Sequence, residues 1–365
     1  MELRNCEAAG SGLLLTWQDH SQAQFDYFWL RDNARDARSF NAASHQRELY
    51  TAAVPLNIEP SSFSVADSGD LVVVWPDLPE AIKYSAEFLY RYRAPDSEYL
   101  YHNPNLWDAD SLEVTPIPYA GLNDQETQVQ LLQTLQANGF VLLQGCPLEK
   151  SSVTAVANSL GYVRETIFGG VWQFEDNQEM ADSAYTADSL RPHTDGTYSH
   201  DAPGLQLLTC LVREATGGES ILVDGFHVAA QFKASQPELF DAMTRIALTG
   251  TYQGDGHVLR ASRPVFRLDN EDRLIQVTFN NYDRDTVRLS DADMRTAYEG
   301  IVAIDQLLNL EQNQWRYVLE AGEMLVFDNW RLLHGRLAYE GRRRMAGAYI
   351  NREDFESKLR GRGLM

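Results

Sequence analysis

The most informative polar residues form the segment His193-Thr194-Asp195 and a second, distant segment around His334. In a strand or at its edge, side chains at positions i and i+2 point the same way, so His193 and Asp195 can contact one ion while Thr194 faces away. His334 is the best candidate for a third ligand, because it follows the apolar run 324–327, which predicts a buried strand. Two imidazoles and one carboxylate leave coordination positions of the metal open, which suits an Fe(II) ion that must also bind a co-substrate and O2. These residues predict a non-haem iron oxygenase.

A cluster of arginines follows His334 along the chain. Arg342, Arg343 and Arg344 precede the apolar and aromatic run 345–350, which predicts a strand. An arginine that projects from such a strand can bind a carboxylate through two parallel hydrogen bonds, as 2-oxoglutarate would require. A solvated basic turn is the alternative interpretation, and we expect it for two of the three residues.

Aromatic residues are concentrated between residues 162 and 200, on either side of the proposed ligands. Core packing is the ordinary explanation, and we expect it for Phe174. Trp172 and Tyr185 lie among polar residues and glycines, and Tyr349 follows the arginines, so these three can line a pocket. Aromatic faces bind quaternary ammonium groups through cation–π contacts.

Composition and charge limit the class of protein. With 365 residues, 44% hydrophobic and 11% aromatic, the chain is globular. The net charge of −21 argues against a nucleic-acid partner and mildly favours a cationic small-molecule substrate. Residues 1–12 lack the pattern of a signal peptide, and no apolar run reaches the roughly 18 residues that span a membrane, which predicts a cytoplasmic protein without a membrane partner. Three separated cysteines, Cys6, Cys146 and Cys210, argue against a disulfide framework.

Two domains of unequal size are predicted. Residues 1–100 form a small β-rich domain, in which we expect strands at 13–17 and 71–77 and a helix at 85–92. The polar, proline-bearing segment 94–104 predicts a linker. In the domain 101–365 we expect a buried strand at 140–143 and helices at 124–138, 151–160, about 226–245 and 291–309. Many strands with few helices predict a mainly β fold with α, in which a double-sheet jelly roll holds the metal at its mouth.

A highly specific set of segments extends over nearly the whole chain: WLRDN (29–33), FNAASHQREL (40–49), RETIFGGVW (164–172), AYT (184–186), HTDGTY (193–198), GGESILVDGF (217–226), FNNYDRD (279–285), FDNWRLLHGR (327–336) and GAY (347–349). Together they resemble the γ-butyrobetaine and trimethyllysine dioxygenase family of Fe(II)/2-oxoglutarate enzymes. The SHQR, RETIFGG and NNYDR segments are more similar to trimethyllysine dioxygenase than to γ-butyrobetaine dioxygenase.

The resemblance implies roles for individual residues. His193, Asp195 and His334 match the iron ligands of the family. Arg343, with Arg344 as the alternative in register, matches the arginine that binds 2-oxoglutarate, and Ser220 matches a second contact to that co-substrate. The implied substrate contacts, most of them an aromatic cage for a trimethylammonium group, are Phe168, Trp172, Asp182, Tyr185, Tyr198, Asn281 and Tyr349.

Asp182 bears most directly on the substrate. The matching position of γ-butyrobetaine enzymes resembles an asparagine that contacts a carboxylate, whereas an aspartate would repel a carboxylate and pair with an α-ammonium group. Trimethyllysine has such a group and γ-butyrobetaine does not; a solvated loop aspartate is the alternative interpretation. Asn280 or Asn281 could donate to the substrate's carboxylate or phosphonate, although paired asparagines also favour turns.

The expected reaction is hydroxylation of a small trimethylammonium compound, N6-trimethyllysine first. γ-Butyrobetaine and 2-(trimethylammonio)ethylphosphonate are the alternative substrates. From other classes, a non-catalytic betaine-binding jelly-roll protein or a metal-dependent isomerase remains open. Relatives further imply a homodimer.

The sequence departs from the family at two places. The region where family members carry zinc-binding cysteines holds Ala34, Asp36, Ser39 and Phe40, which leaves His45 without thiolate partners. No zinc is therefore expected, and packing must hold the small domain. Gly196 replaces a larger side chain beside Asp195, and we expect it to enlarge or reshape the pocket.

Overall fold

The computed structural model of the chain describes residues 1–94, 104–175, 186–286 and 288–365. It contains two compact units, Met1–Glu98 and Tyr99–Met365. The expected linker at 94–104 falls almost wholly outside the described residues, as do the predicted site residues Asp182 and Tyr185. No helix among the described residues is long and apolar enough to cross a membrane.

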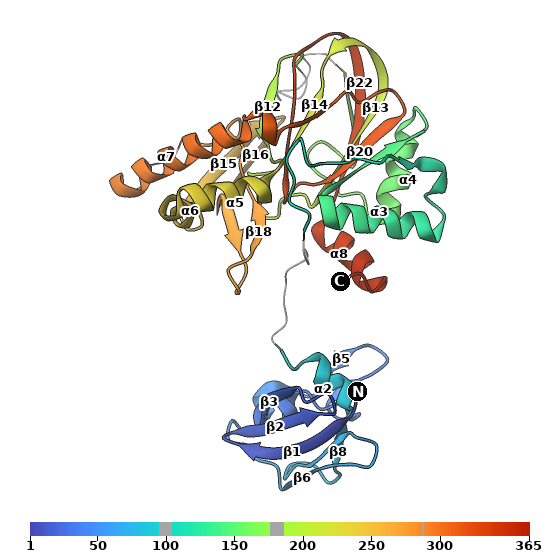
Figure 1. Ribbon diagram of the computed structural model, residues 1–365, viewed down its shortest axis with the longest axis vertical. Coiled ribbons are helices and arrows are strands. Elements are labelled where there is room, and N and C mark those ends of the chain that lie inside the picture. Colours follow the sequence, from blue (N-terminus) through green and yellow to red (C-terminus); the bar gives the residue numbers. More distant parts are fainter. Residues whose placement is uncertain (95–103, 176–185, 287) are drawn as a thin grey trace. The chain divides into compact units, whose positions relative to one another are not determined.

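The N-terminal unit is rich in short antiparallel strands (Figure 1). Two three-stranded sheets have the orders β1-β2-β3 and β6-β7-β8, and β4 pairs with β5. The elements are β1 (Leu3–Ala9), β2 (Gly12–Trp17), β3 (Gln22–Asp26), α1 (Tyr27–Asp32), β4 (Phe40–Asn41), β5 (Gln46–Arg47), η1 (Thr51–Ala53), β6 (Ser62–Val65), β7 (Leu71–Val74), β8 (Ile82–Tyr84) and α2 (Ala86–Arg91).

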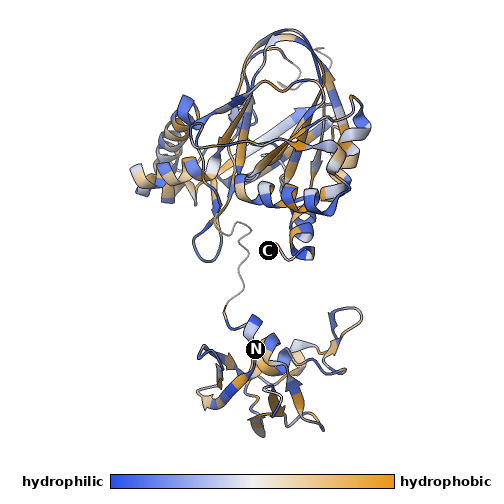
Figure 2. Ribbon diagram, turned by 45° about the vertical axis from the view of Figure 1, so that its right-hand side comes forward, coloured by the Kyte–Doolittle hydropathy of each residue, from blue (hydrophilic) through white to orange (hydrophobic). Residues whose placement is uncertain are grey.

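Alternating burial explains the strands of this unit. Leu13, Leu15 and Trp17 of β2 are fully buried, as are Leu71 and Val73 of β7, because every second side chain of a strand faces the same side. Hydrophobic residues therefore gather along the strands of the unit (Figure 2). Both strands agree with the prediction from sequence.

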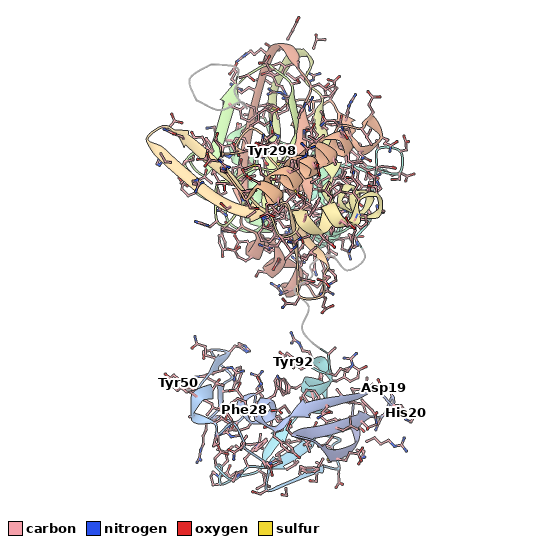
Figure 3. All side chains as sticks on the ribbon, turned by 90° about the vertical axis from the view of Figure 1, so that its left-hand side faces the viewer. Asp19, His20, Phe28, Tyr50, Tyr92 and Tyr298 are labelled. Atoms are coloured by element: carbon pink, nitrogen blue, oxygen red, sulfur yellow. The ribbon has the colours of Figure 1, made fainter. Side chains whose placement is uncertain are left out.

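A buried arginine supplements this core. The Arg31 side chain is 3% exposed; its Nε donates to Asp77 at 2.9 Å and its Nη1 donates to the Ser39 hydroxyl at 3.1 Å. His45 lies on an exposed turn with φ 54°. The labelled side chain of Tyr92 in Figure 3 packs at the border of the core. Apolar packing and the arginine network both contribute to the stability of the unit.

Two sheets form the centre of the C-terminal unit (Figure 1). The larger has the order β11-β22-β13-β20-β10-β9 and the smaller the order β12-β21-β14-β19. Their strands are β9 (Ile117–Pro118), β10 (Phe140–Gln144), β11 (Val171–Glu175), β12 (Leu190–His193), β13 (Leu205–Gly217), β14 (Ser220–Asp224), β19 (Trp315–Tyr317), β20 (Glu323–Asp328), β21 (Leu332–Arg336) and β22 (Tyr339–Ile350). Two hairpins lie outside these sheets, β15 (Ala247–Gly254) with β16 (His257–Pro264) and β17 (Phe266–Leu268) with β18 (Leu274–Val277).

The chain passes repeatedly between the two sheets. β13 belongs to the larger sheet and β14 to the smaller, and the same change of sheet occurs from β20 to β21 and back to β22. Gly217 and Gly218 make the turn between β13 and β14 with φ of 78° and 74°, a backbone region that strongly favours glycine. This winding is a double-stranded β-helix, and the predicted jelly-roll fold is confirmed.

Helices cover the sheets. α3 (Gln125–Asn138) and α4 (Lys150–Leu160) pack on the larger sheet, and α5 (Gly225–Ser235), α6 (Pro237–Met243) and α7 (Asp291–Leu308) gather beside the smaller one, followed at the end of the chain by α8 (Arg352–Gly361). Asp124 caps α3 by accepting from the Thr127 N–H, and Gly139 ends it with φ 79°. The helices expected at 124–138, 151–160 and 291–309 are therefore confirmed.

The single helix expected at about 226–245 is wrong. The structure divides this segment into α5 and α6, which meet at Gln236. Gln236 has φ −143° and ψ 66°, and Pro237 begins α6. A proline disfavours helical geometry in the residue before it but suits the first turn of a helix, so it ends one helix and begins the next.

An ion pair without solvent exposure supports the turn before β21. Asp224, at the end of β14, and Arg331 have 0% exposed side chains and lie 2.7 Å apart. Arg331 also donates to the carbonyl oxygens of Ala137 at 2.8 Å and Asn105 at 2.7 Å. The pair thus joins the segment that leads to His334 with α3 and β14.

Replacing Asp224 with alanine should lower the unfolding free energy of the chain by about 3–5 kcal/mol, because it leaves a buried guanidinium without its counter-ion. Denaturant unfolding measures the change. The control is Glu299→Ala, which breaks an exposed pair with Arg295 on α7 and should cost about 1 kcal/mol or less. Equal losses in the two variants would contradict the role given to the buried pair.

Candidate metal centre and pocket

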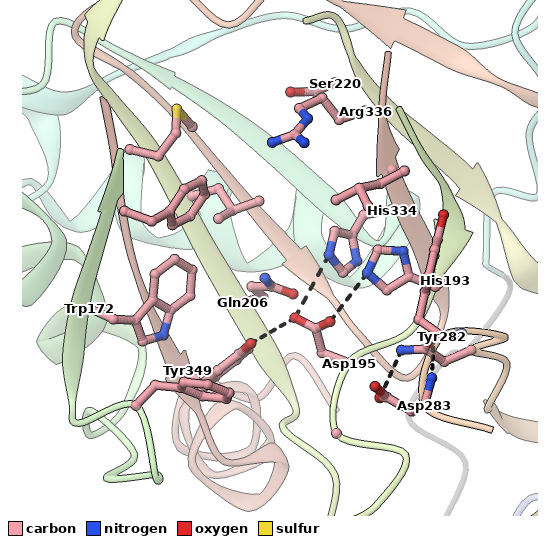
Figure 4. A pocket seen from close by; sticks show the side chains of 18 of the residues that line it. Trp172, His193, Asp195, Gln206, Ser220, Tyr282, Asp283, His334, Arg336 and Tyr349 are labelled. Atoms are coloured by element: carbon pink, nitrogen blue, oxygen red, sulfur yellow. Dashed lines mark hydrogen bonds and ion pairs between the residues drawn. The ribbon is translucent and has the colours of Figure 1, made fainter. Parts of the chain in front are cut away.

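Backbone pairing between β12 and β21 brings the two predicted histidines together. His193 is the direct partner of His334, and their ring centroids lie 4.4 Å apart. Oδ1 of Asp195 lies 3.5 Å from Nε2 of His193, and Oδ2 lies 3.8 Å from Nε2 of His334 (Figure 4). The three ligand atoms are within 4.8 Å of one another. Two imidazole nitrogens and one carboxylate oxygen in this arrangement fit a single Fe(II) ion.

Hydrogen bonds fix the orientation of these side chains. The Asp195 N–H donates to Oδ1 of Asn329 at 2.8 Å, and Nδ2 of Asn329 donates back to the Asp195 carbonyl at 3.0 Å. The Tyr349 hydroxyl donates to Oδ2 of Asp195 at 2.7 Å. Nδ1 of His193 lies 2.8 Å from the Arg191 carbonyl, which places the proton on Nδ1 and leaves the Nε2 lone pair for a metal.

Burial and mutual charge set the protonation of the three ligands. Burial lowers the pKa of His334 to about 4, and His193 adds to the effect, so His334 is neutral near pH 7. Burial also acts to lower the pKa of His193, but the hydrogen bond and charge of Asp195 outweigh it and raise that pKa above its usual value. For Asp195, burial acts upward, yet the two imidazoles and Tyr349 hold its pKa well below the usual range.

Gly196 lines the pocket, but the absence of its side chain does not enlarge it; of the two effects expected from sequence, only a change of shape is compatible with the structure. Its φ is 71°, and a Cβ added there would lie 2.5 Å from Cδ of Pro203. The missing side chain therefore points at Pro203 rather than at the pocket. The glycine allows the backbone to turn sharply after Asp195.

A basic wall faces the metal-ligand cluster across the same pocket. Arg343, 6% exposed, lines this pocket together with Ser220 and Arg336. Arg343 stands an even number of residues before Tyr349 on β22, so both face the pocket, whereas Arg344 is outside the pocket lining. Burial lowers the pKa of Arg343 to about 10, with a further contribution from Arg336. Among the described residues, no carboxylate forms an ion pair with Arg343.

Arg336 was not anticipated from the sequence. It is 6% exposed, and its Nη2 donates to the carbonyl oxygens of Thr186 at 2.6 Å and Asp188 at 2.8 Å. Arg342, by contrast, is half exposed and pairs with Glu175 at 2.6 Å, as expected for a surface arginine.

Aromatic side chains form another wall of the pocket. Phe168, Trp172, Tyr198 and Tyr349 line it as expected. Phe174 packs against a buried hydrophobic cluster, as predicted from the sequence, and also lines the pocket. Phe174 follows Trp172 by two residues on β11 and therefore faces the same side, with ring centroids 5.7 Å apart. The rings of Trp172 and Tyr349 are 5.6 Å apart.

Gly347 makes room for Trp172. The two residues are partners in the pairing of β11 with β22, and a Cβ on Gly347 would overlap Cη2 of the indole. The Trp172 ring can therefore lie across the neighbouring strand only because residue 347 has no side chain. The GAY segment thus supplies both the space for Trp172 and the Tyr349 ring beside it.

Asn281 is not part of this pocket. It is exposed and lines a smaller neighbouring cavity, whereas Asn280 lines the main pocket. The Asn280 amide donates to Asp283 at 2.9 Å, and its oxygen accepts from the Tyr282 N–H at 2.8 Å. Local turn bonds therefore engage Asn280, which makes it a poor donor for a substrate.

Gln206 is a further pocket residue that the sequence prediction missed. It is 2% exposed, and its side-chain oxygen has no hydrogen-bond partner among the described residues. One indication of this residue was present in the sequence: Gln206 is a polar residue within the otherwise apolar start of strand β13. A buried acceptor of this kind is costly unless a ligand or water satisfies it.

A jelly roll with two histidines and one carboxylate at the mouth is the architecture of a mononuclear metal enzyme. Residues 103–349 match the family model described as taurine catabolism dioxygenase TauD, TfdA family, and residues 5–90 match the model described as gamma-butyrobetaine hydroxylase-like, N-terminal. The chain belongs to the TauD/TfdA dioxygenase family.

Individual proteins show the same relationship. Human mitochondrial trimethyllysine dioxygenase is 31% identical over 378 residues, covering 98% of this chain and 89% of its own. Human gamma-butyrobetaine dioxygenase is 27% identical over 361 residues, covering 95% and 93%. The solved structure of PvcB, an Fe, alpha-ketoglutarate dependent oxygenase, has a TM-score of 0.50 at 18% identity, covering 70% of this chain and 94% of its own, and shares the fold.

Lowering the pH from about 8 to about 6 should weaken Mn(II) binding, with a slope of about tenfold per pH unit below the pKa of His193. The raised pKa of His193 lets one proton compete with the metal, whereas His334, with a pKa of about 4, stays neutral throughout. Affinity is therefore full above the His193 pKa and lost as the pH falls through it. Electron paramagnetic resonance of free Mn(II) measures this affinity at each pH. A pH-independent affinity would contradict this assignment.

Proposed function

We propose that this chain hydroxylates a small trimethylammonium compound, N6-trimethyllysine first, with Fe(II), 2-oxoglutarate and O2. The observation that carries the proposal is the composition of one pocket. It joins the metal-ligand cluster, a buried arginine without an acidic partner among the described residues, and a wall of aromatic rings. These three features suit, respectively, an iron ion, a dicarboxylate and a quaternary cation.

His193, Asp195 and His334 would hold the iron. Bound there with 2-oxoglutarate and O2, Fe(II) would supply the oxidative decarboxylation of 2-oxoglutarate to succinate and CO2 and the hydroxylation of a C–H bond of the substrate. The chain's contribution is placement. Hydrogen bonds from Asn329 and Tyr349 keep Asp195 oriented, and buried surroundings keep His334 neutral and ready to coordinate.

Arg343 and Ser220 would bind the distal carboxylate of 2-oxoglutarate. Ser220 pairs with Arg336 in the sheet, so the hydroxyl and two guanidinium groups lie in one region of the pocket. A carboxylate there would relieve the mutual repulsion of the two arginines and form charge-assisted hydrogen bonds. Removing this charge should weaken co-substrate binding without affecting the metal ligands.

The aromatic wall would bind the trimethylammonium group. Trp172 and Tyr349 form its centre, with Phe168 and Tyr198 beside them. A quaternary ammonium ion has no N–H to donate, so aromatic faces are its most suitable partners. Fixing the cation there would hold a carbon a few bonds away beside the metal, and such positioning supplies much of the rate enhancement.

Relatedness supports trimethyllysine as the first substrate, because the human enzyme of that name is more similar to this chain than the human gamma-butyrobetaine enzyme is. The predictions for Asp182 and Tyr185 remain predictions, since both lie outside the described residues. γ-Butyrobetaine and 2-(trimethylammonio)ethylphosphonate stay as alternative substrates. The complete metal-ligand set argues against a protein that only binds betaines and against an isomerase.

Four further expectations accompany the proposal: the division into domains, the oligomeric state, the location and the absence of zinc. We propose that residues 1–100 act as a separate β-rich domain and that residues 101–365 carry the catalytic activity. A homodimer and a cytoplasmic location also stay predictions. The absence of zinc is expected because thiolate ligands are missing at 34, 36 and 39.

Succinate formation tests the function. With Fe(II), O2 and 2-oxoglutarate, N6-trimethyllysine should give succinate and hydroxylated product in equal amounts, and γ-butyrobetaine and 2-(trimethylammonio)ethylphosphonate should react more slowly. Mass spectrometry of both products measures the ratio. A preference for one of the other two substrates would refute the substrate assignment alone. No stimulated succinate with any trimethylammonium compound would refute the proposed function.

Arg343→Met should raise the KM for 2-oxoglutarate on the order of a hundredfold, because it removes a buried charge that pairs with a carboxylate. Arg342→Met is the matched control, since Arg342 is half exposed and pairs with Glu175 outside the pocket. It should leave the KM unchanged. Similar KM values in the Arg343 variant and the wild type would contradict the assigned register.

A further inference from the structure

Tyr349 contacts both functional halves of the pocket (Figure 4). Its ring lies 5.6 Å from the Trp172 ring, within the proposed cage. Its hydroxyl donates a 2.7 Å hydrogen bond to Oδ2 of Asp195, within the proposed metal-ligand set. One side chain therefore links the place for the cation directly to the place for the metal.

This hydrogen bond distinguishes the two oxygens of Asp195. Oδ1 lies 3.5 Å from Nε2 of His193, whereas Oδ2 lies 3.8 Å from Nε2 of His334 and also accepts the Tyr349 proton. A carboxylate can bind a metal ion through one oxygen or through both. The Tyr349 hydroxyl opposes binding through both oxygens, because its hydrogen bond uses a lone pair of Oδ2 and holds that oxygen in place.

The number of oxygens that bind matters for the chemistry. Three protein ligand atoms on one face of an octahedron leave three positions open. With iron bound, 2-oxoglutarate would need two of these positions for its 2-oxo acid end, and O2 would need the third. A carboxylate that bound through both oxygens would remove one of the positions on which the reaction depends.

We propose that Tyr349 is a positioning residue that keeps Asp195 on the metal through one oxygen and couples the cation in the cage to the metal centre. The proposal rests on the function proposed above. A cation at the face of a phenol ring withdraws electron density from it, which makes the hydroxyl a stronger hydrogen-bond donor. Cation binding thus strengthens the hold on Oδ2 of Asp195.

The surroundings of Tyr349 keep this geometry fixed. On β22 it is the direct partner of Gln206 on β13, and its carbonyl accepts from the Arg164 N–H at 2.8 Å. The residue is only 9% exposed. Because the strand and the neighbouring residues hold the Tyr349 ring, a bound cation does not shift the ring. Its effect therefore falls on the hydroxyl group.

Trp172 provides the matched comparison. It shares the proposed cage with Tyr349, but its indole nitrogen has no hydrogen-bond partner among the described residues. Loss of the indole should therefore affect the cation alone. Loss of the Tyr349 hydroxyl should affect the metal, while the phenyl ring still faces the cation.

The test measures Mn(II) affinity by electron paramagnetic resonance in the full chain and in Tyr349→Phe and Trp172→Phe, with and without choline as the cation probe. We expect Tyr349→Phe to weaken Mn(II) binding by about tenfold and Trp172→Phe to leave it unchanged. In the wild type, choline should tighten Mn(II) binding, and Mn(II) should tighten choline binding by the same factor. That factor should fall to about one in Tyr349→Phe.

The uncharged analogue 3,3-dimethylbutan-1-ol adds a test that needs no variant. It has the shape of choline without the charge, so it should occupy the cage of the wild type without tightening Mn(II) binding. Equal tightening by the two compounds would overturn the proposed coupling through charge, even if the phenylalanine variant failed to fold.

The remaining outcomes separate the two proposals. Unchanged Mn(II) affinity in a folded Tyr349→Phe protein would refute the positioning of Asp195. A coupling factor that survives in that variant would refute transmission through the hydroxyl. If neither choline nor N6-trimethyllysine binds the wild type, the proposed function and the coupling both fail. The effect of Tyr349→Phe on Mn(II) alone would still decide the positioning role.

Discussion

The backbone register that sets His193 opposite His334 is the constraint on which the site depends. This register joins two segments that are far apart in the chain, and it places both imidazole rings on the same face of the sheet. Asp195 then needs only to be held beside them, which Asn329 does by bonding its backbone on both sides. Because a shift of one residue in the pairing would turn every side chain to the other face, the register and the metal-ligand set stand or fall together.

Several features of the pocket oppose stability and make sense only for a ligand. Arg343 is buried beside a second arginine, and the side-chain oxygen of Gln206 is buried without a partner among the described residues. Groups of this kind cost free energy in the empty protein. The surrounding structure offsets the cost through the apolar packing of the core.

Many helices and strands and the choice of His193, Asp195 and His334 could be predicted from the sequence, because they rest on local periodicity and short motifs. Local periodicity does not specify the long-range pairing that sets His193 opposite His334. The alternation of side chains along a strand carried further information that the sequence prediction did not use. It places Phe174 beside Trp172 on one face of β11, and it turns Arg343 and Arg344 to opposite faces of β22. Pro237 likewise marked the break between α5 and α6. By contrast, the contacts of Arg336 and of Tyr349 join segments remote in sequence, and no local pattern specifies which carbonyl or carboxylate such a side chain will meet.

Anomalous diffraction from crystals grown without O2 in Fe(II) and 2-oxoglutarate would test the central claim most directly. The account predicts one iron ion at roughly 2 Å from Nε2 of both His193 and His334 and from a single oxygen of Asp195. It also predicts the distal carboxylate of 2-oxoglutarate at Arg343. An iron ion bound elsewhere, or a dicarboxylate that does not reach Arg343, would contradict the assignment of the pocket.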